Sequence, residues 1–185
     1  MSSTNEKILI PGVKDGETFK VGGMEFIKFP GKDGLTPVVM KDMAFFSNFG
    51  SNNNLKKSKI IKRLEKEILP KIVVEIGEEN VCTFETDLTT LDGLKDCGKM
   101  ESKIILPTLD FYRTNVEIFD KHKVGRWWWL ATPDSAPSHG NPYWVLCVSP
   151  SGYFYYVYIN GIDSGVRPFL IFNSSIFESY ENGRE

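Results

Sequence analysis

The feature that most constrains this chain is an aromatic run in its C-terminal half. All four tryptophans lie between Trp127 and Trp144, and five of the seven tyrosines lie between Tyr143 and Tyr158. Aromatic side chains supply a large, stiff contact area at a small cost in conformational entropy. A run this dense therefore forms either half of a hydrophobic core or a recognition surface.

The segment from Tyr153 to Tyr158 favours recognition. Five of its six residues are Tyr or Phe. Because successive side chains of a strand point to opposite faces, these aromatic residues cannot all face one interior. At least one face is expected to be exposed or to be covered by a partner, and large exposed apolar patches are typical of binding sites.

The composition around this segment supports the same interpretation. The chain contains 17 Lys and 14 Glu, but it has neither between Asp134 and Gly165. Tyr, Ser, Gly, Asn, Asp, His, Phe and Pro stand there instead, as they do in antibody loops. The predicted ligand-binding residues are Ser138, His139, Asn141, Tyr143, Tyr153, Tyr155, Tyr156, Tyr158, Asn160 and Asp163.

Length and charge limit the classes of protein to which the chain can belong. At 185 residues and 41% hydrophobic, one domain can bury its own core. We predict a single domain over 1–185, with a scaffold carrying both helices (1–125), an aromatic display hairpin with closing strands (126–172) and a polar tail (173–185). The net charge of -2 gives no basic excess, so neither nucleic acid nor a membrane is an expected partner.

The cysteines and the N-terminus give further expectations. Cys82, Cys97 and Cys147 are an odd number without a CxxC pair, and we expect them to be reduced rather than bridged or bound to zinc. Residues 1–7 lack the apolar region of a signal peptide, and no stretch approaches the ~18 apolar residues of a membrane span. A soluble protein that is not exported by this route is therefore expected.

Glycines and apolar alternation predict strands in the first third of the chain. Short strands are expected at 8–10, 19–21, 25–29 and 37–40, with a hairpin turn at Gly22 and Gly23. A polar loop over 47–54 ends in three asparagines, any of which can cap the next helix. That helix is predicted over 55–69, with a solvated basic face, and is expected to stop at Pro70.

The rest of the chain alternates strands and one more helix. Strands are predicted at 72–74 and 103–106, and a helix with Thr108 as its N-cap is predicted to end near His122. Further strands are expected at 127–130, 144–148, 153–159 and 166–172, with a loop over 131–142 and turns at 149–152 and 160–161. The fold class is therefore α+β, with two helices on a twisted antiparallel sheet.

Sequence patterns for catalysis are weak. The chain has no GxSxG, phosphate-loop, dinucleotide or HExxH motif, so no catalytic residue is predicted. Glu85, Asp87 and Asp92 could ligate calcium, but their spacing favours solvated caps and Asx turns. Cys97 or Cys147 could act as a nucleophile paired with His139, but the spacing of these residues gives no reason to prefer this over buried thiols. No metal or cofactor is predicted.

Three segments carry a resemblance to a known family. Trp127 to Pro133, the turn Val148 to Gly152, and Gly165 to Pro168 resemble the C-type-lectin-like region of bacterial and phage proteins, where a WWLRSP-like strand precedes a GVRP strand. The resemblance is specific over 126–172 and looser before it. It implies a C-type-lectin-like fold, with Arg167 in a structural role.

Some members of this family are variable proteins of diversity-generating retroelements. Error-prone copying of Asn codons at template adenines yields Tyr, Phe, Ser, Asp, His, Gly or Asn, but never Lys or Glu. Tyr153, Asn160 and Asp163 belong to this reachable set, as do their aromatic neighbours, whereas Trp144 does not. The resemblance therefore implies changeable side chains on a fixed scaffold.

The expected function is non-enzymatic binding to a protein or glycan receptor on a cell surface. The resemblance implies that the protein is a phage virion protein or an adhesin, located in the virion or in the bacterial cytoplasm before assembly. One alternative is a virion assembly protein whose aromatic face packs on another subunit, including a homo-oligomer. Another is a formylglycine-generating type of oxidase, which uses paired cysteines with copper. The chain lacks such a pair, and it also lacks the Glu-Pro-Asn and Trp-Asn-Asp signatures of calcium-dependent lectins.

Overall fold

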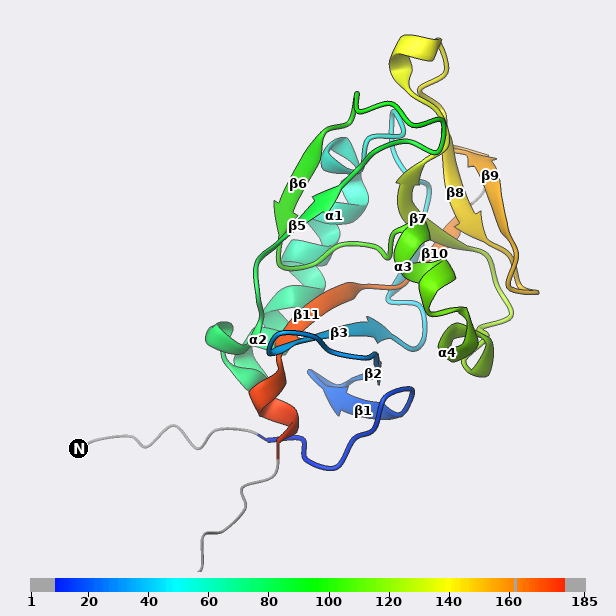
Figure 1. The fold of residues 1–185 in the computed structure, drawn as a ribbon. Helices are drawn as coiled ribbons and strands as arrows, with labels where there is room; N and C mark the ends of the chain where they lie inside the picture. The colour runs from blue at the N-terminus through cyan, green and yellow to red at the C-terminus, as the bar shows by residue number, and fades with distance from the viewer. Residues whose placement is uncertain (1–8, 162, 179–185) are drawn as a thin grey trace, which may run out of the picture.

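The computed structural model describes residues 9–161 and 163–178 and has the predicted mixed α+β architecture (Figure 1). The strands of these residues form a four-stranded sheet, a five-stranded sheet and a two-stranded ribbon. The prediction of one twisted sheet is therefore wrong. The C-terminal strands divide between two sheets because the chain bends between them.

The four-stranded sheet is antiparallel and has the order β1-β2-β3-β11. Its strands are β1 (Thr18–Val21), β2 (Met24–Lys28), β3 (Leu35–Met40) and β11 (Phe169–Asn173). Gly22 and Gly23 have φ angles of 62° and 74°, the left-handed backbone that a two-residue hairpin requires. The predicted hairpin is confirmed. Of the predicted strand at 8–10, residue 8 lies outside the described residues, and Ile10 bonds instead to the carbonyl of Ile176.

The five-stranded sheet has the order β4-β10-β7-β8-β9, with β10 parallel to β7 and the other pairs antiparallel. Its strands are β4 (Phe45–Ser47), β7 (Trp128–Pro133), β8 (Trp144–Val148), β9 (Phe154–Tyr158) and β10 (Ser164–Val166). The predicted β8–β9 hairpin is confirmed. The predicted loop start at Ala131 is wrong, because an irregularity in the β7–β8 register lets β7 continue to Pro133.

The predicted strand over 166–172 is two strands. The chain leaves the five-stranded sheet after Val166, bends at Arg167 and Pro168, and enters the four-stranded sheet at Phe169. The Pro168 carbonyl accepts the N–H of Met40 at 2.9 Å, which holds the bend against the end of β3. The bend therefore joins the two sheets covalently.

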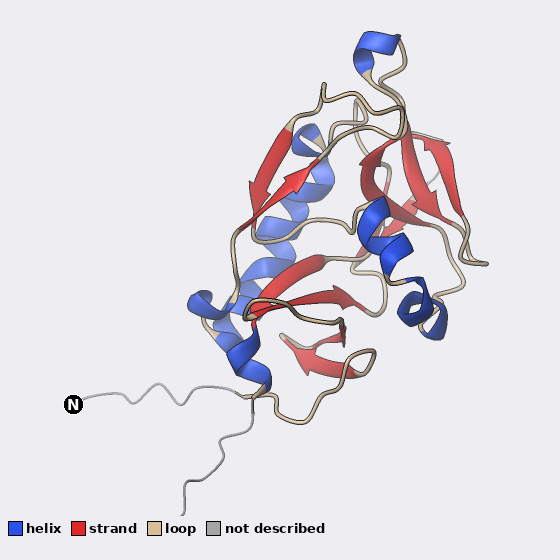
Figure 2. Cartoon of the chain, viewed as in Figure 1, coloured by secondary structure: helices blue, strands red, loops and turns tan. Residues whose placement is uncertain are grey.

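A long helical segment lies beside both sheets (Figure 2). It comprises η1 (Leu55–Lys57), α1 (Lys59–Arg63), the π-helical turn η2 (Leu64–Ile68) and α2 (Leu69–Ile76). Its N-terminal end contacts β7 and its C-terminal end contacts β1. Asn54 caps η1, as predicted for one of the asparagines, and Ser58 caps α1.

The predicted helix end at Pro70 and the predicted strand at 72–74 are wrong. Leu69 donates its N–H to the carbonyl of Leu64, five residues earlier, which is a π-helical bond. Pro70 then lies in the first turn of α2, where its missing N–H is tolerated. The helix ends at Gly77, whose φ is 85°.

A short ribbon follows the helical segment. After η3 (Glu78–Asn80), β5 (Phe84–Asp87) pairs with β6 (Lys99–Ser102). The predicted strand at 103–106 is wrong, since β6 ends at Ser102 and only Ile105 makes an isolated bridge, to Phe169. The apolar residues of 103–106 instead fill the core from an irregular segment, with Ile104, Ile105 and Leu106 buried.

Two short helices replace the single helix predicted after Pro107. They are α3 (Leu109–Thr114) and α4 (Val116–Lys121), separated at Asn115. Thr108 is the N-cap, as predicted, and accepts the N–H of Phe111 at 3.2 Å.

The predicted polar tail over 173–185 begins too early. Residues 173–177 are structured, because β11 ends at Asn173 and η5 (Ser174–Phe177) buries Ile176. Residues 179–185 lie outside the described part.

Trp128 and Trp129 anchor the five-stranded sheet from its two faces. Trp128 stacks on Phe119 of α4, with ring centroids 5.6 Å apart. Trp129 is fully buried against Phe49 and donates its Nε1–H to the carbonyl of Ser47 at 2.7 Å. These residues form a fixed frame for β8 and β9.

No helix in the described residues is long and apolar enough to cross a membrane.

Candidate functional site

Six aromatic side chains gather at the β9 edge of the five-stranded sheet. They are Tyr143, Tyr153, Phe154, Tyr155, Tyr156 and Tyr158, and we call them the aromatic edge. Each is exposed, from 41% for Tyr158 to 68% for Tyr153. The structure therefore brings five of the predicted site residues together and adds Phe154. Phe154 belongs to the same aromatic strand, and its exposure could have been inferred from that pattern.

The aromatic edge has two faces, each supported by a tryptophan. Trp144 packs against Tyr156 and Tyr158, with ring centroids 5.4 and 5.6 Å apart and nearly perpendicular planes. On the opposite face, Trp127 packs edge-on against Tyr155 at 5.6 Å. Edge-to-face packing restrains the rings and leaves much of their surface in solvent. The exposed aromatic residues are thus positioned before any partner arrives.

The backbone of β9 also has an open side. The carbonyl of Tyr153 accepts the N–H of Ser149 at 2.7 Å, and the carbonyl of Tyr143 accepts the N–H of Ile159 at 2.9 Å. Backbone groups alternate in direction along an antiparallel strand, so odd-numbered residues of β9 face β8. The N–H and C=O groups of Phe154 and Tyr156 consequently point away from the sheet.

The other edge strands of the described sheets are protected against such pairing. β1 contains Lys20, β5 contains Glu85 and Asp87, and β6 contains Lys99 and Glu101. β4 has no charge but is only three residues long. β11 is also uncharged and is covered by the isolated bridges from Val81 and Ile105. Charges and shortness are the usual means of preventing edge-to-edge association. β9 has five residues and no charge or proline, so it lacks these protections.

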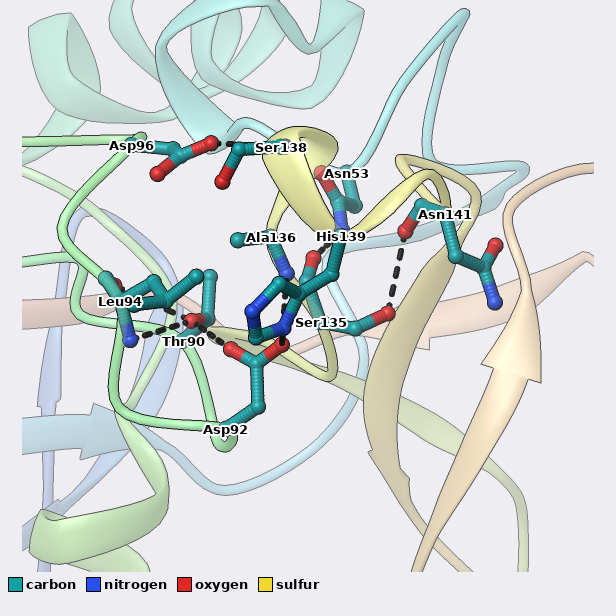
Figure 3. Close-up of polar contacts among 10 residues, drawn as sticks. All are labelled: Asn53, Thr90, Asp92, Leu94, Asp96, Ser135, Ala136, Ser138, His139 and Asn141. Atoms are coloured by element: carbon teal, nitrogen blue, oxygen red, sulfur yellow. Dashed lines mark hydrogen bonds and ion pairs between the residues drawn. The ribbon is translucent and has the colours of Figure 1, made fainter.

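Three other predicted site residues lie in the loop that carries η4 (Pro137–His139) and precedes β8 (Figures 1 and 3). His139 Nδ1 lies 2.7 Å from a carboxylate oxygen of Asp92, and Ser138 donates its backbone N–H to Asp96 at 2.8 Å. The carbonyl of Asn141 accepts the hydroxyl of Ser135 at 3.0 Å. We call residues 135–141 the tip loop.

Asp92 holds the tip loop to the segment that follows β5 (Figure 3). It accepts hydrogen bonds from the Thr90 hydroxyl, from the Ala136 N–H at 3.1 Å and from His139. The Thr90 hydroxyl first, and then the Ala136 N–H and His139, lower the pKa of Asp92 to about 2. The local contact expected for Asp92 is present, through Thr90, but Ala136 and His139 lie across the fold and were not expected. Asp87 does form the predicted Asx turn, to Thr89 N at 2.9 Å.

The tip loop does not assemble a nucleophile with the imidazole. Ser138 lies beside Asp96, whereas His139 points toward Asp92 (Figure 3). Cys147 is buried next to Ser164, and burial raises the pKa of this thiol to about 12. Among the described residues, no group of three or more His, Cys, Asp or Glu side chains could hold a metal ion.

Asn160 and Asp163 follow β9 and are exposed. Asp163 lines a shallow hollow of about 530 Å³ together with Phe46, Arg126, Trp127 and others. Arg126 lies over the Phe46 ring, 5.4 Å from its centroid. The ten predicted residues therefore fall in three places: the aromatic edge, the tip loop and the end of β9. The sequence gives no signal for the contacts of the tip loop with Asp92 and Asp96.

Comparison of the chain with protein-family models, curated proteins and solved structures found no match.

Proposed function

We propose that this protein is a non-enzymatic recognition protein that binds its partner through the aromatic edge. The observation that carries the proposal is the set of six exposed aromatic side chains on and beside one uncharged edge strand. Monomeric proteins seldom expose a contiguous apolar patch without a binding role. Tyrosine is suited to such a role because its ring buries area while its hydroxyl hydrogen-bonds.

The proposed partner is a receptor on a cell surface, either a protein or a glycan. Rings packed edge-to-face against Trp127 and Trp144 offer exposed surface for apolar contact. The outward N–H and C=O groups of Phe154 and Tyr156 favour a protein partner, because an extended segment can hydrogen-bond to them as an added strand. A phage virion protein or an adhesin is the proposed setting.

The C-type-lectin-like fold and the diversified hairpin belong to the same proposal. Support comes from the aromatic β7–β8–β9 meander, from the buried tryptophans beneath it and from the Gly165 to Pro168 bend. The changeable residues of β9 project from a frame that Trp128 and Trp129 fix. A neighbouring reverse transcriptase gene with a template repeat of codons 126–172 would support diversification. Its absence would leave binding without diversification.

An assembly protein is the second candidate. It is favoured by the same uncharged edge, because two copies of β9 can pair antiparallel about Tyr156 without bringing like charges together. In that pairing Phe154 of one copy lies opposite Tyr158 of the other. The aromatic edge would then be a subunit interface rather than a receptor site.

The test replaces Tyr153, Tyr155, Tyr156 and Tyr158 with Ser. A matched control replaces three exposed apolar residues elsewhere, Leu35, Val74 and Leu91, with Ser. Binding of the fluorescently labelled proteins to a panel of bacterial cells is measured by flow cytometry, the oligomeric state by sedimentation, and stability by urea unfolding.

Recognition predicts that the tyrosine variant stays folded but loses cell binding, while the control retains both. Unfolding of the tyrosine variant would contradict the proposal, since the edge would then be part of the core. Loss of self-association by a folded variant, with no cell binding by the parent protein, would favour assembly.

A further inference from the structure

A cavity of about 540 Å³ lies between β5, the N-terminal turn of α3 and β11. Its volume is within the range of small-molecule sites, roughly 300–1,000 Å³. None of the aromatic-edge residues lines it, so a ligand held there would be independent of the proposed recognition surface.

The inner wall of this cavity is aromatic. Phe169 of β11 lies between Phe84 of β5 and Phe111 of α3, with ring centroids 5.4 and 4.8 Å away and both contacts edge-to-face. Phe169 is 7% exposed, whereas Phe84 and Phe111 are only partly buried. Surface of these two residues therefore remains for contact with a ligand, and covering it removes apolar area from water.

The charged residues of β5 do not face the interior of the cavity. Successive side chains of a strand point to opposite sides, so Phe84 and Thr86 face the cavity while the exposed carboxylates of Glu85 and Asp87 face away. Each of these carboxylates is also engaged on its own side, Glu85 by a lysine at 2.6 Å and Asp87 by a backbone N–H at 2.9 Å. Neither is free to pair with a ligand inside the cavity.

The two charged residues of α3 that line the cavity are paired with each other. Nη2 of Arg113 lies 2.7 Å from a carboxylate oxygen of Asp110, and both side chains are exposed. An ionised ligand would thus lose hydration and meet only charges that are already engaged, which is costly. The lining therefore favours a neutral ligand over a cation or an anion.

Two threonine hydroxyls supply polar contacts for such a ligand. The hydroxyl of Thr132 on β7 accepts the N–H of Leu109 at 2.9 Å, and that of Thr108 accepts the N–H of Phe111 at 3.2 Å. Both threonines line the cavity. A hydroxyl that accepts an N–H still carries a proton of its own to donate. The cavity therefore offers hydrogen-bond donors that carry no charge.

We propose that this cavity binds a small neutral compound, one or two aromatic rings that carry a carbonyl or hydroxyl oxygen. The rings pack on Phe84, Phe111 and Phe169, and the oxygen accepts a hydrogen bond from Thr108 or Thr132. A neutral oxygen is favoured over an ionised group because it loses much less hydration on entering the cavity.

Three probes of nearly the same shape and different charge test this proposal. 4-Phenyl-2-butanone is neutral, 3-phenylpropanoate is its anionic counterpart, and 3-phenylpropanamidinium is its cationic counterpart. Each is titrated into the ¹⁵N-labelled full chain, and amide chemical shifts are followed. The proposal predicts saturable shifts at Thr86, Leu109 and Phe111 with the ketone, and at least about tenfold weaker binding of both ions.

A pair of matched variants locates the binding site. Phe84→Leu keeps an apolar side chain on β5 but removes the ring, and it is expected to weaken binding of the ketone several-fold. Phe46→Leu makes the same change on β4, outside the cavity lining, and is expected to leave binding unchanged. Urea unfolding checks that both variants are folded, and the comparison of the three probes on the parent protein depends on neither.

Three outcomes would each overturn the proposal. They are binding of either ion as tightly as the ketone, equal effects of the two variants on ketone binding, and the lack of saturable shifts at the cavity residues.

Discussion

His139 and Asp92, 47 residues apart in the chain, meet at 2.7 Å and fasten the tip loop to the segment after β5. The same Asp92 carboxylate accepts the N–H of Ala136, so side chain and backbone of the tip loop are held together. Each partner of Asp92 lies in a loop. Together with Asp96, which accepts the N–H of Ser138, Asp92 makes the position of the tip loop depend on two carboxylates.

Acid is expected to release the tip loop. The pKa of Asp92 is lowered from 3.8 to about 2 in the folded protein. Because the pKa is depressed, its contribution is present above about 3.8 and is lost as the pH falls toward 2. Hydrogen exchange of the Ala136 amide, corrected for intrinsic exchange, should show protection that declines between pH 4 and pH 2.

Asp92→Asn is the matched variant for this prediction, since it removes the titrating group and keeps the shape. Its Ala136 amide should be less protected at pH 5 and should change little down to pH 2. The amide of buried Trp129 reports global unfolding in the same spectra. Parallel loss of protection at Ala136 and Trp129 in the parent protein would contradict local release.

Gly165→Ala is expected to destabilise the fold. A Cβ added at Gly165 would lie 2.2 Å from the sulfur of Met43, so the Met43 side chain must move. Overpacking of this kind costs roughly 1–3 kcal/mol. The free energy of unfolding in urea measures the change.

A double-mutant cycle separates the clash from other effects. Met43→Ala is predicted to recover part of the stability lost in Gly165→Ala, because the space that the new methyl needs is vacated. Additive losses from the two substitutions would show that Met43 is not the cause.

Replacing Arg167 with Lys is expected to lower the free energy of unfolding. Arg167 is 1% exposed, and its guanidinium lies 4.8 Å from the Trp128 ring centroid. Its Nε donates to the carbonyl of Met40 at 3.0 Å. Burial lowers its pKa to about 10, so the group is still charged at pH 7. A Lys replaces neither the planar stacking nor the Nε bond, and the loss should be about 2–4 kcal/mol.

Arg167→Met provides the comparison. Nη2 of Arg167 is buried without a partner among the described residues, so the wild-type charge is itself imperfectly satisfied. Met removes this charge and fills part of the volume, and it should destabilise less than Lys does. Urea midpoints that decrease in the order Arg, Met, Lys would support this account. A Lys variant as stable as the parent would refute it.

Thiol labelling should distinguish the three cysteines. Cys97 and Cys147 are buried, whereas Cys82 is partly exposed. Burial raises the pKa of each thiol, and raises that of Cys147 furthest, to about 12. A disulfide reagent at pH 8 should therefore label Cys82 first and label the others only on unfolding. Cys82→Ser should abolish the fast phase, and rapid labelling of that variant would contradict the prediction.

Local signals predicted the hairpins and caps of this fold. Gly22 and Gly23 mark a turn by their own conformational freedom, and Thr108 caps α3 through a neighbour three residues away. Such features need no knowledge of the distant chain. The exposure of β9 followed from its pattern as well, since aromatic residues occupied both of its faces.

Errors arose where distant or unusual backbone decided the outcome. Pro70 ended the predicted helix, but a π-helical turn before it lets the helix continue to Ile76. The single strand predicted over 166–172 covers parts of two strands, because strand propensity carries no information about a change of sheet at Arg167 and Pro168. Ala136 and His139, the distant partners of Asp92, come near it only in the folded chain.

The bend at Arg167 and Pro168 also has a consequence for biosynthesis. β10 pairs with β4 and β7, and β11 pairs with β3, so residues 164–173 complete both main sheets. As the chain emerges from the ribosome, the β1–β2–β3 and β7–β8–β9 meanders can form from local contacts. β4 nevertheless lacks β10 until residues 164–166 have been translated, and β3 lacks β11 until residues 169–173 have been.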